Sequence, residues 1–367
     1  MTPRTARPPG GVHAVERAAD LPRQAWDALT RPSDVFLSTH WLDVVESTAG
    51  VAMTYLWVER AGVPVAGLAT ALATASVPWA LGRPDVVLRN SADADLTGAA
   101  DYLAGLPAEP VSSLMPSLVA GGRHLGNTRV LYGPQATAGD LDTLVAAAES
   151  RARDAGAASI AFLYLDENDR LLASVLATRR YASYTSGRYS SLHIPSDGFD
   201  GCLASLPRKR RVSIRAERRK LRDADTSVAV ESLDRADLPR FAELEAELLR
   251  KYGIDWRPDQ SLPQLRQVRD RFGEDAFAIV ARGDGQIRGF GLVLRHKGHW
   301  YARQTGYDYA YQRKSGLPLY FELLYYRLVE EAAAAGVTTV HYGLGSEETK
   351  RSRGCAVTDQ RCHLLRL

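Results

Sequence analysis

The sequence predicts an α/β protein built from two copies of one unit, each a mixed sheet flanked by helices. Three features occur in both halves in the same order. A strand–glycine turn–strand pattern lies at 53–73 and at 275–295, and a helix–glycine–strand pattern lies at 140–165 and at 317–345. The tripeptide Asp-Leu-Pro precedes the first helix of each half, at Asp20–Pro22 and Asp237–Pro239. Because the similarity extends over half of the chain, it indicates a duplicated domain and not a solenoid, whose repeats span about 20–50 residues.

In the first half, apolar residues at core-like spacing predict helical structure over 18–50. The hairpin at 53–73 turns at Ala61-Gly62, a pair suited to a tight turn. Glycine and proline are scattered through 76–130, which we treat as inserted material with helices at Ser91–Ala104 and Ser112–Ala120. A helix at 140–156 and a strand at 159–165 follow, then a helix at 171–181 and a strand at 183–194.

In the second half, a strand is expected at 298–310 (GHWYARQTGYDYA) and a long helix from Leu317 to Ala335. Apolar residues recur along that helix at three- and four-residue spacing, so one face is apolar and is expected to pack against the sheet. Ser315 is expected to cap it and Gly336 to end it. The strand 337–345 (VTTVHYGLG) and a polar tail, 346–354 (SEETKRSRG), follow. Ligand-handling groups of α/β folds usually follow strands, so this tail is the first candidate for function.

A strongly basic segment joins the two copies. From Arg208 to Arg222, nine residues are basic and only Glu217 is acidic. The expected organisation is a first unit at 12–195 with its insertion at 76–130, a basic linker helix at 196–225, and a second unit at 226–367 that carries the site. Six arginines fall along one side of the helix: Arg208, Arg211, Arg215, Arg218, Arg219 and Arg222. The helix is either a solvated linker or a surface that contacts phosphates; without interleaved aromatic residues, base stacking is disfavoured.

Composition limits the class of protein. The 367 residues are 45% hydrophobic and 24% charged, with a net charge of +3, as in ordinary globular proteins of two domains. Three cysteines without disulfide or zinc spacing favour a reducing cytoplasm. The N-terminus lacks the apolar stretch of a secretory signal, and no run approaches the ~18–20 apolar residues of a membrane span. We expect a cytoplasmic protein without a membrane span, a metal or a bound cofactor; its oligomeric state is left open.

Three stretches resemble one known family: SLPRKRRVSIRAERRK at the junction, GHWYARQTGYDYA, and GLGSEETKRSRGC, which has the form G-x-x-x-x-K-x-x-R-G. With the duplicated layout, they resemble the tandem acetyltransferase-like (GNAT-like) fold of the Fem family, and more narrowly the FemAB-like proteins of peptidoglycan biosynthesis. The resemblance implies an aminoacyltransferase that moves an amino acid from aminoacyl-tRNA, its co-substrate, to an amine or hydroxylamine. Such peptide bond formation serves cell-wall synthesis or, in actinobacterial relatives, antibiotic biosynthesis.

The expected chemistry needs a cation or donor at the oxyanion and a route for the proton of the attacking nitrogen. Lys350, at the signature position, is assigned to the oxyanion or to the terminal phosphate–ribose of the donor, and a surface lysine is the alternative. Asp308 is the candidate for orienting or deprotonating the amine, although a turn-forming aspartate is equally compatible, and Tyr307 beside it is grouped with the catalytic residues. The candidate substrate-binding residues are Tyr301, Arg303, Gln304, Glu322, Glu347 and Arg353.

Two other functions stay open. An acyl-CoA-dependent N-acyltransferase would cradle the pyrophosphate of CoA in a glycine-rich loop. The corresponding segment, Gln312–Pro318, has one glycine, and its proline removes a backbone donor. The third possibility is a catalytically silent member that acts as a binding module for peptidoglycan precursors or RNA.

Overall fold

A computed structural model describes residues 11–48, 50–76, 80–122 and 128–367. The chain forms two compact units, residues 1–189 with 358–367 and residues 190–357. Residues 196–225, expected as a linker helix, therefore belong to the second unit, and residues 358–367, expected in the second unit, belong to the first.

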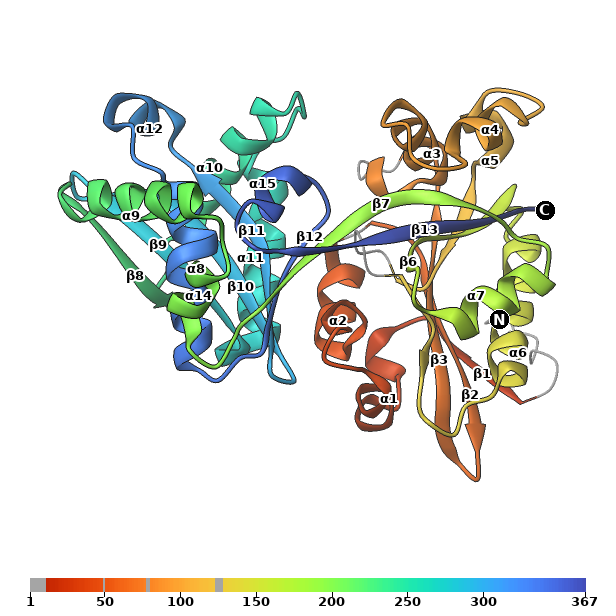
Figure 1. The fold of residues 1–367 in the computed structure, drawn as a ribbon. Helices are drawn as coiled ribbons and strands as arrows, with labels where there is room; N and C mark the ends of the chain where they lie inside the picture. Colours follow the sequence, from red (N-terminus) through yellow and green to blue (C-terminus); the bar gives the residue numbers. More distant parts are fainter. Residues whose placement is uncertain (1–10, 49, 77–79, 123–127) are drawn as a thin grey trace. The chain divides into compact units, whose positions relative to one another are not determined.

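The first unit is a sheet of strand order β1-β2-β3-β4-β6-β13, with β5 paired to β3 and β7 beside β13. Its strands are β1 (Val12–Val15), β2 (Met53–Arg60), β3 (Val63–Ala73), β4 (Ser117–Ala120), β5 (Leu131–Tyr132), β6 (Ser159–Asp166), β7 (Ala182–His193) and β13 (Ala356–Arg366). Its helices are α1 (Arg23–Leu29), α2 (Thr39–Thr48), α3 (Pro84–Asp93), α4 (Ala99–Ala104), α5 (Pro110–Leu114), α6 (Ala138–Asp154) and α7 (Arg170–Thr178) (Figure 1).

The second unit repeats this order as β8-β9-β10-β11-β12, followed by the end of β7. Its strands are β8 (Thr226–Ser232), β9 (Ala276–Gly283), β10 (Gln286–His296), β11 (His299–Tyr307) and β12 (Thr339–Gly343). Its helices are α8 (Gly198–Ala204), α9 (Arg208–Arg222), α10 (Leu238–Lys251), α11 (Pro258–Phe272), α12 (Tyr309–Ser315), α13 (Leu319–Phe321), the π-helical turn η5 (Glu322–Tyr326), α14 (Arg327–Ala334) and α15 (Glu347–Arg351).

The two sheets share one feature that shapes the site. In each unit, one pair of neighbouring strands is parallel, β4 with β6 and β11 with β12, next to antiparallel pairs such as β3 with β4, β6 with β13, β10 with β11 and β7 with β12. The hairpins also correspond, since β2–β3 turns at Ala61-Gly62 and β9–β10 at Asp284-Gly285, with positive φ at both residues of each turn. The prediction of a duplicated α/β unit with a mixed sheet is confirmed.

Two elements differ from expectation. Ser112–Ala120 is half helix α5 and half strand β4; Pro116 separates them, and the apolar run after it is buried as a parallel strand. A run that short does not distinguish a buried strand from a helix. The long helix begins at Leu319, after Gly316 has ended α12 with a φ of 62°, so Ser315 closes one helix and does not cap the next. Part of the polar tail is helix α15.

Candidate functional site

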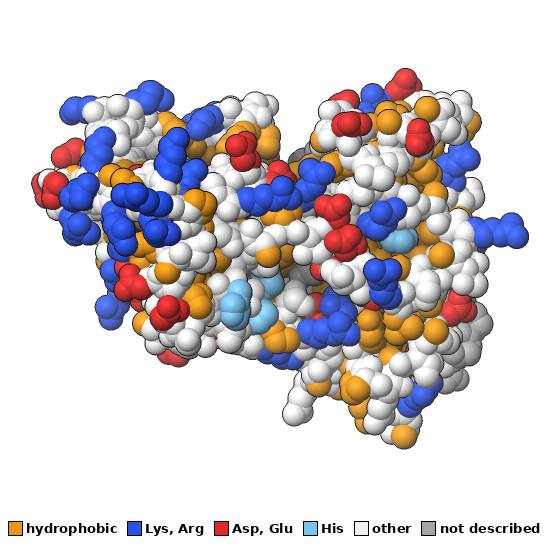
Figure 2. Space-filling model, viewed as in Figure 1, with side chains coloured by type: hydrophobic (Ala, Val, Ile, Leu, Met, Phe, Trp, Pro, Cys, Tyr) orange, Lys and Arg blue, Asp and Glu red, His pale blue; other side chains and the backbone are white. Residues whose placement is uncertain are grey.

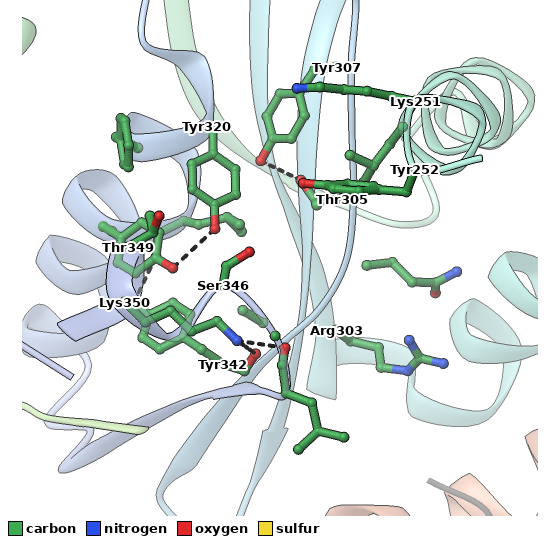
Figure 3. A pocket seen from close by; sticks show the side chains of 18 of the residues that line it. Lys251, Tyr252, Arg303, Thr305, Tyr307, Tyr320, Tyr342, Ser346, Thr349 and Lys350 are labelled. Atoms are coloured by element: carbon green, nitrogen blue, oxygen red, sulfur yellow. Dashed lines mark hydrogen bonds between the residues drawn. The ribbon is translucent and has the colours of Figure 1, made fainter. Parts of the chain in front are cut away.

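The candidate site opens where two parallel strands separate. Strands β11 and β12 pair over only three residues each, His299–Tyr301 with Thr339–His341. Beyond Tyr301, β11 continues along β10, whereas β12 ends at Gly343 and the chain turns into α15. The space between them is a cavity of about 700 Å³, a size that suits a small-molecule or cofactor fragment (Figure 3).

A β-bulge lies at the point of separation. Leu292 of β10 is opposite Gln304 and the next residue, Val293, is opposite Ala302, so Arg303 is the extra residue of β11. Bulges occur frequently beside active sites because they redirect side chains and interrupt pairing. Arg303 and Gln304 both line the cavity. The amide of Gln304 donates to both oxygens of Glu245, at 3.0 and 3.1 Å, and burial lowers the pKa of Arg303.

Tyrosines dominate the cavity wall. Those that line it are Tyr252, Tyr307, Tyr309, Tyr320, Tyr325 and Tyr342, joined by Phe321. Figure 3 shows the side chains of Tyr307, Tyr320 and Ser346 directed into the same space. The hydroxyls of Thr305 and Tyr307 lie 2.6 Å apart, and burial holds the pKa of Tyr307 well above its usual value. Tyr307 therefore lines the cavity as a neutral phenol.

Lys350 lines the cavity, but its ammonium group is fully engaged. Its Nζ donates to the carbonyl oxygens of Tyr342, Gly343 and Leu344, at 2.9, 2.9 and 2.8 Å. Burial lowers its pKa to about 8. Since an ammonium has three protons, this geometry leaves none for an oxyanion. In this structure Lys350 holds the loop that forms one wall of the cavity.

Several other candidate residues do not line the cavity. Asp308 caps α12 through the Tyr311 amide and accepts from Arg288 at 2.8 Å. Tyr301 is buried and stacks on His341, with ring centroids 4.4 Å apart. Glu322, in η5, is paired with Arg218 at 3.4 Å. Glu347, half-buried, lies in the first turn of α15.

Arg353 is buried in a network that ties α9 to the cavity wall. Its guanidinium group lies 3.8 Å from the centroid of Phe321, donates to the Tyr326 hydroxyl at 3.1 Å and contacts Glu217 at 3.4 Å. The Tyr326 hydroxyl also donates to Glu217. Because Leu324 and Tyr325 of the same turn line the cavity, the single acid of α9 supports the cavity wall.

The six arginines of α9 divide into two groups. Arg211 and Arg218 are half-buried; Arg211 donates to the Leu206 carbonyl at 2.6 Å and Arg218 to Glu330 at 2.9 Å. Ile214 and Leu221 anchor that side in the core of the second unit. The exposed arginines are Arg208, Arg215, Arg219 and Arg222. Figure 2 shows basic side chains gathered over α9. We call these four residues the basic face.

Among the described residues, no group of three or more His, Cys, Asp or Glu side chains is placed to hold a metal ion. Within the same part of the chain, no helix has both the length and the apolar character that crossing a bilayer requires.

Comparison with known proteins agrees with this architecture. Residues 208–351 match the model of an acetyltransferase (GNAT) domain, so the second unit contains a domain of that type. Over 96% of both chains, the structure is similar to that of FemX, with a TM-score of 0.63 and 12% identity. The chain therefore has the tandem GNAT fold of FemAB-like proteins.

Two further solved structures share this FemAB-like fold. A conserved protein of unknown function from Bacteroides thetaiotaomicron has a TM-score of 0.56 and 12% identity, over 95% of this chain and 97% of its own. A tandem GNAT protein from the clavulanic acid biosynthesis pathway, solved without AcCoA, has a TM-score of 0.54 and 14% identity, over 97% and 98%. No curated protein matches the sequence.

Sequence reasoning missed the tyrosines other than Tyr307, and Lys251, which lies 4.4 Å above the ring of Tyr309. One signal was present, because eight of the chain's 16 tyrosines lie between Tyr301 and Tyr342. Their shared cavity depends on strand separation, which local patterns do not reveal.

Proposed function

We propose that the protein is an acyltransferase that moves an aminoacyl group from aminoacyl-tRNA to an amine and so forms an amide bond. The supporting observation is the cavity between β11 and β12 in a GNAT-type domain whose helix α9 has an exposed basic face. The product belongs to cell-wall or natural-product biosynthesis in this proposal, and the reaction takes place in the cytoplasm.

The chemistry rests on backbone donors. In an antiparallel pair, alternate N–H groups of β11 point away from β10, and beyond Tyr301 they lose β12 as a partner. Such fixed donors suit the oxyanion that forms when an amine attacks an acyl carbonyl, and loss of one donor commonly costs ~10²–10³ in rate. Lys350 then acts as a positioning residue that shapes the opposite wall.

The basic face supports the choice of donor. Arg208, Arg215, Arg219 and Arg222 follow one side of α9, and the described contacts include no acidic partner for them. At the end of the helix, Lys220 donates to the carbonyl of Gly316 at 2.8 Å, between the lining residues Gln312 and Tyr320. A nucleic acid backbone on this face would reach the cavity mouth. Contacts with its phosphates would position the RNA but would not distinguish its base sequence.

A direct test incubates the protein with a pool of charged tRNAs and an amine and measures amide product. Binding of tRNA should weaken with salt at a log–log slope of about −0.7 to −0.9 per phosphate contact. The Arg215→Gln, Arg219→Gln double variant should flatten the slope by one to two contacts. Arg266→Gln, an exposed arginine of α11, is the control and should leave it unchanged. Salt-independent binding would remove tRNA from the proposal.

An acyl-CoA donor is the second candidate, because Arg313 and Lys314 are exposed just before Gly316 and attract an anion. The same assay with acetyl-CoA decides between the two donors. Binding of tRNA without product from either donor would identify the silent binding module instead.

A further inference from the structure

The charges around the cavity bear on the acceptor. Among the described residues that line it there is no aspartate or glutamate, whereas Lys251, Arg303 and Lys350 are basic. Its other titratable groups are the six tyrosines, and Tyr307, Tyr325 and Tyr342 are kept protonated by burial, which raises the pKa of each. A positively charged ammonium would thus enter a partly desolvated space with like charges and no counter-ion, which is unfavourable.

Four of the acids that adjoin the cavity are committed to other partners. Each is held by a cation or an amide of the protein: Glu245 by Gln304, Asp308 by Arg288, Glu322 by Arg218 and Glu217 by Arg353. Glu247 lies near Tyr309 and Glu347 lies near Lys350, but neither these two nor Glu348 lines the cavity. Recruiting any of the four would break its existing interaction, so none is available as a general base.

Aromatic faces are the remaining way to bind an ammonium, through cation–π attraction. Two such faces in the wall already hold protein cations. Lys251 lies 4.4 Å above the ring of Tyr309, and Arg353 lies 3.8 Å from the ring of Phe321. At the remaining aromatic faces, cation–π attraction for an incoming ammonium is opposed by repulsion from the three basic side chains.

We propose that the acceptor is a weakly basic amine, one with a substantial uncharged fraction near neutral pH, which enters the cavity as the free base. The α-amino group of a peptide, an aryl amine and a hydroxylamine belong to this class; an unperturbed lysine side chain does not. At pH 7, a peptide α-amino group of pKa about 8 is uncharged in roughly one molecule in ten, about 230 times more often than a lysine amine of pKa about 10.4. This inference rests on the proposed acyl transfer.

The step needs no base from the protein. The nitrogen lone pair of the free amine attacks the acyl carbon and forms the C–N bond, while the carbonyl oxygen becomes the oxyanion beside β11. The C–O bond of the ester then breaks, and the ribose oxygen leaves with the proton that the nitrogen loses.

Two measurements test the proposal. The first follows kcat/KM against pH for hydroxylamine, glycinamide and ethylamine. Each profile should rise with pH to a midpoint at the pKa of the amine used, so the midpoint moves from one amine to the next. A midpoint that stays at one pH for all three would reveal a base in the enzyme and overturn the inference.

The second measurement does not depend on turnover. Calorimetry at pH 7 should show aniline, which is uncharged, binding at least tenfold more tightly than benzylamine, which is charged. Ser346→Asp places a carboxylate in the wall at an exposed N-cap position with φ of 54°, which aspartate tolerates, and should remove or reverse this preference. Equal binding of the two amines by the unaltered protein contradicts the proposal. If the preference holds but no donor yields product, the proposed transfer fails and the inference about the cavity stands.

Discussion

Replacing Lys350 by methionine separates a structural from a chemical role for this residue. Methionine keeps most of the buried chain but removes the ammonium that joins the carbonyls of Tyr342, Gly343 and Leu344. A hydrogen bond from a charged group contributes about 1.5–3 kcal/mol. The free-energy cost of burying the charge opposes the contribution of these three hydrogen bonds. Burial lowers the pKa from 10.5 to about 8, and at about 1.4 kcal/mol per unit this offsets roughly 3 kcal/mol. The expected net loss of stability is about 1–5 kcal/mol.

The assay is urea unfolding followed by tryptophan fluorescence, in which Trp256 and Trp300 report on the second unit. Lys314→Met is the control, since Lys314 is exposed on α12, and it should change stability by no more than about 0.5 kcal/mol. If Lys350→Met is as stable as the unaltered protein but loses ~10²–10³ in rate, Nζ acts on the reacting atoms and the structural reasoning is refuted.

Three further predictions concern residues around the cavity. Glu217→Gln leaves Arg353 without its counter-charge. It should lower kcat at least tenfold and change the KM of the donor less than twofold. A large change in KM with little change in kcat would instead make Glu217 part of donor binding. Burial opposes ionisation of Asp308, but the Tyr311 amide and nearby arginines outweigh it and lower its pKa. Asp308→Asn should therefore be about 1–3 kcal/mol less stable at pH 7, with the difference lost as pH falls below about 3.8. Gly306→Ala places a Cβ 2.4 Å from the backbone of Leu244 and should destabilise by more than about 3 kcal/mol in the same urea assay, whereas a tolerated substitution would refute the close packing of β11 on α10.

Much of the fold could be predicted from the sequence because the patterns that specify its helices and turns are local. Helix α9 (Arg208–Arg222) covers the basic part of the linker helix expected at 196–225, and Pro207 precedes it; the earlier part of that range forms a separate helix, α8. The Ala61-Gly62 turn lies where a two-residue hairpin connection was expected. The boundaries of the two units were harder to predict from the sequence, because the pairing of β13 with β6 joins segments about 200 residues apart along the chain.

The site was less predictable from the sequence because it depends on which partners the ends of the side chains contact in the folded protein. Arg353 and Asp308 have the residue types of a catalytic pair, yet Phe321 and Glu217 hold the first, and Arg288 holds the second. The signature pattern identified the loop that forms the cavity wall. It did not show that the protons of Lys350 point into that loop.

The duplication itself supports assigning the chemistry to the second unit. In the first unit, the parallel strands β4 and β6 also pair over only three residues each, Ser117–Val119 with Ser159–Ala161. Beyond that point the chain's own backbone occupies the opening, because the Thr128 amide donates to the Tyr164 carbonyl at 3.0 Å and Thr128 forms a parallel bridge with Leu165. The strand of the second unit that corresponds to β6 is β12. Beyond its pairing with β11, the described bridges give β12 no such partner on that side, and the cavity lies there. One copy thus fills the space between its diverging parallel strands with its own backbone, whereas the other keeps a cavity there, which favours placing the proposed acyl transfer in the second unit.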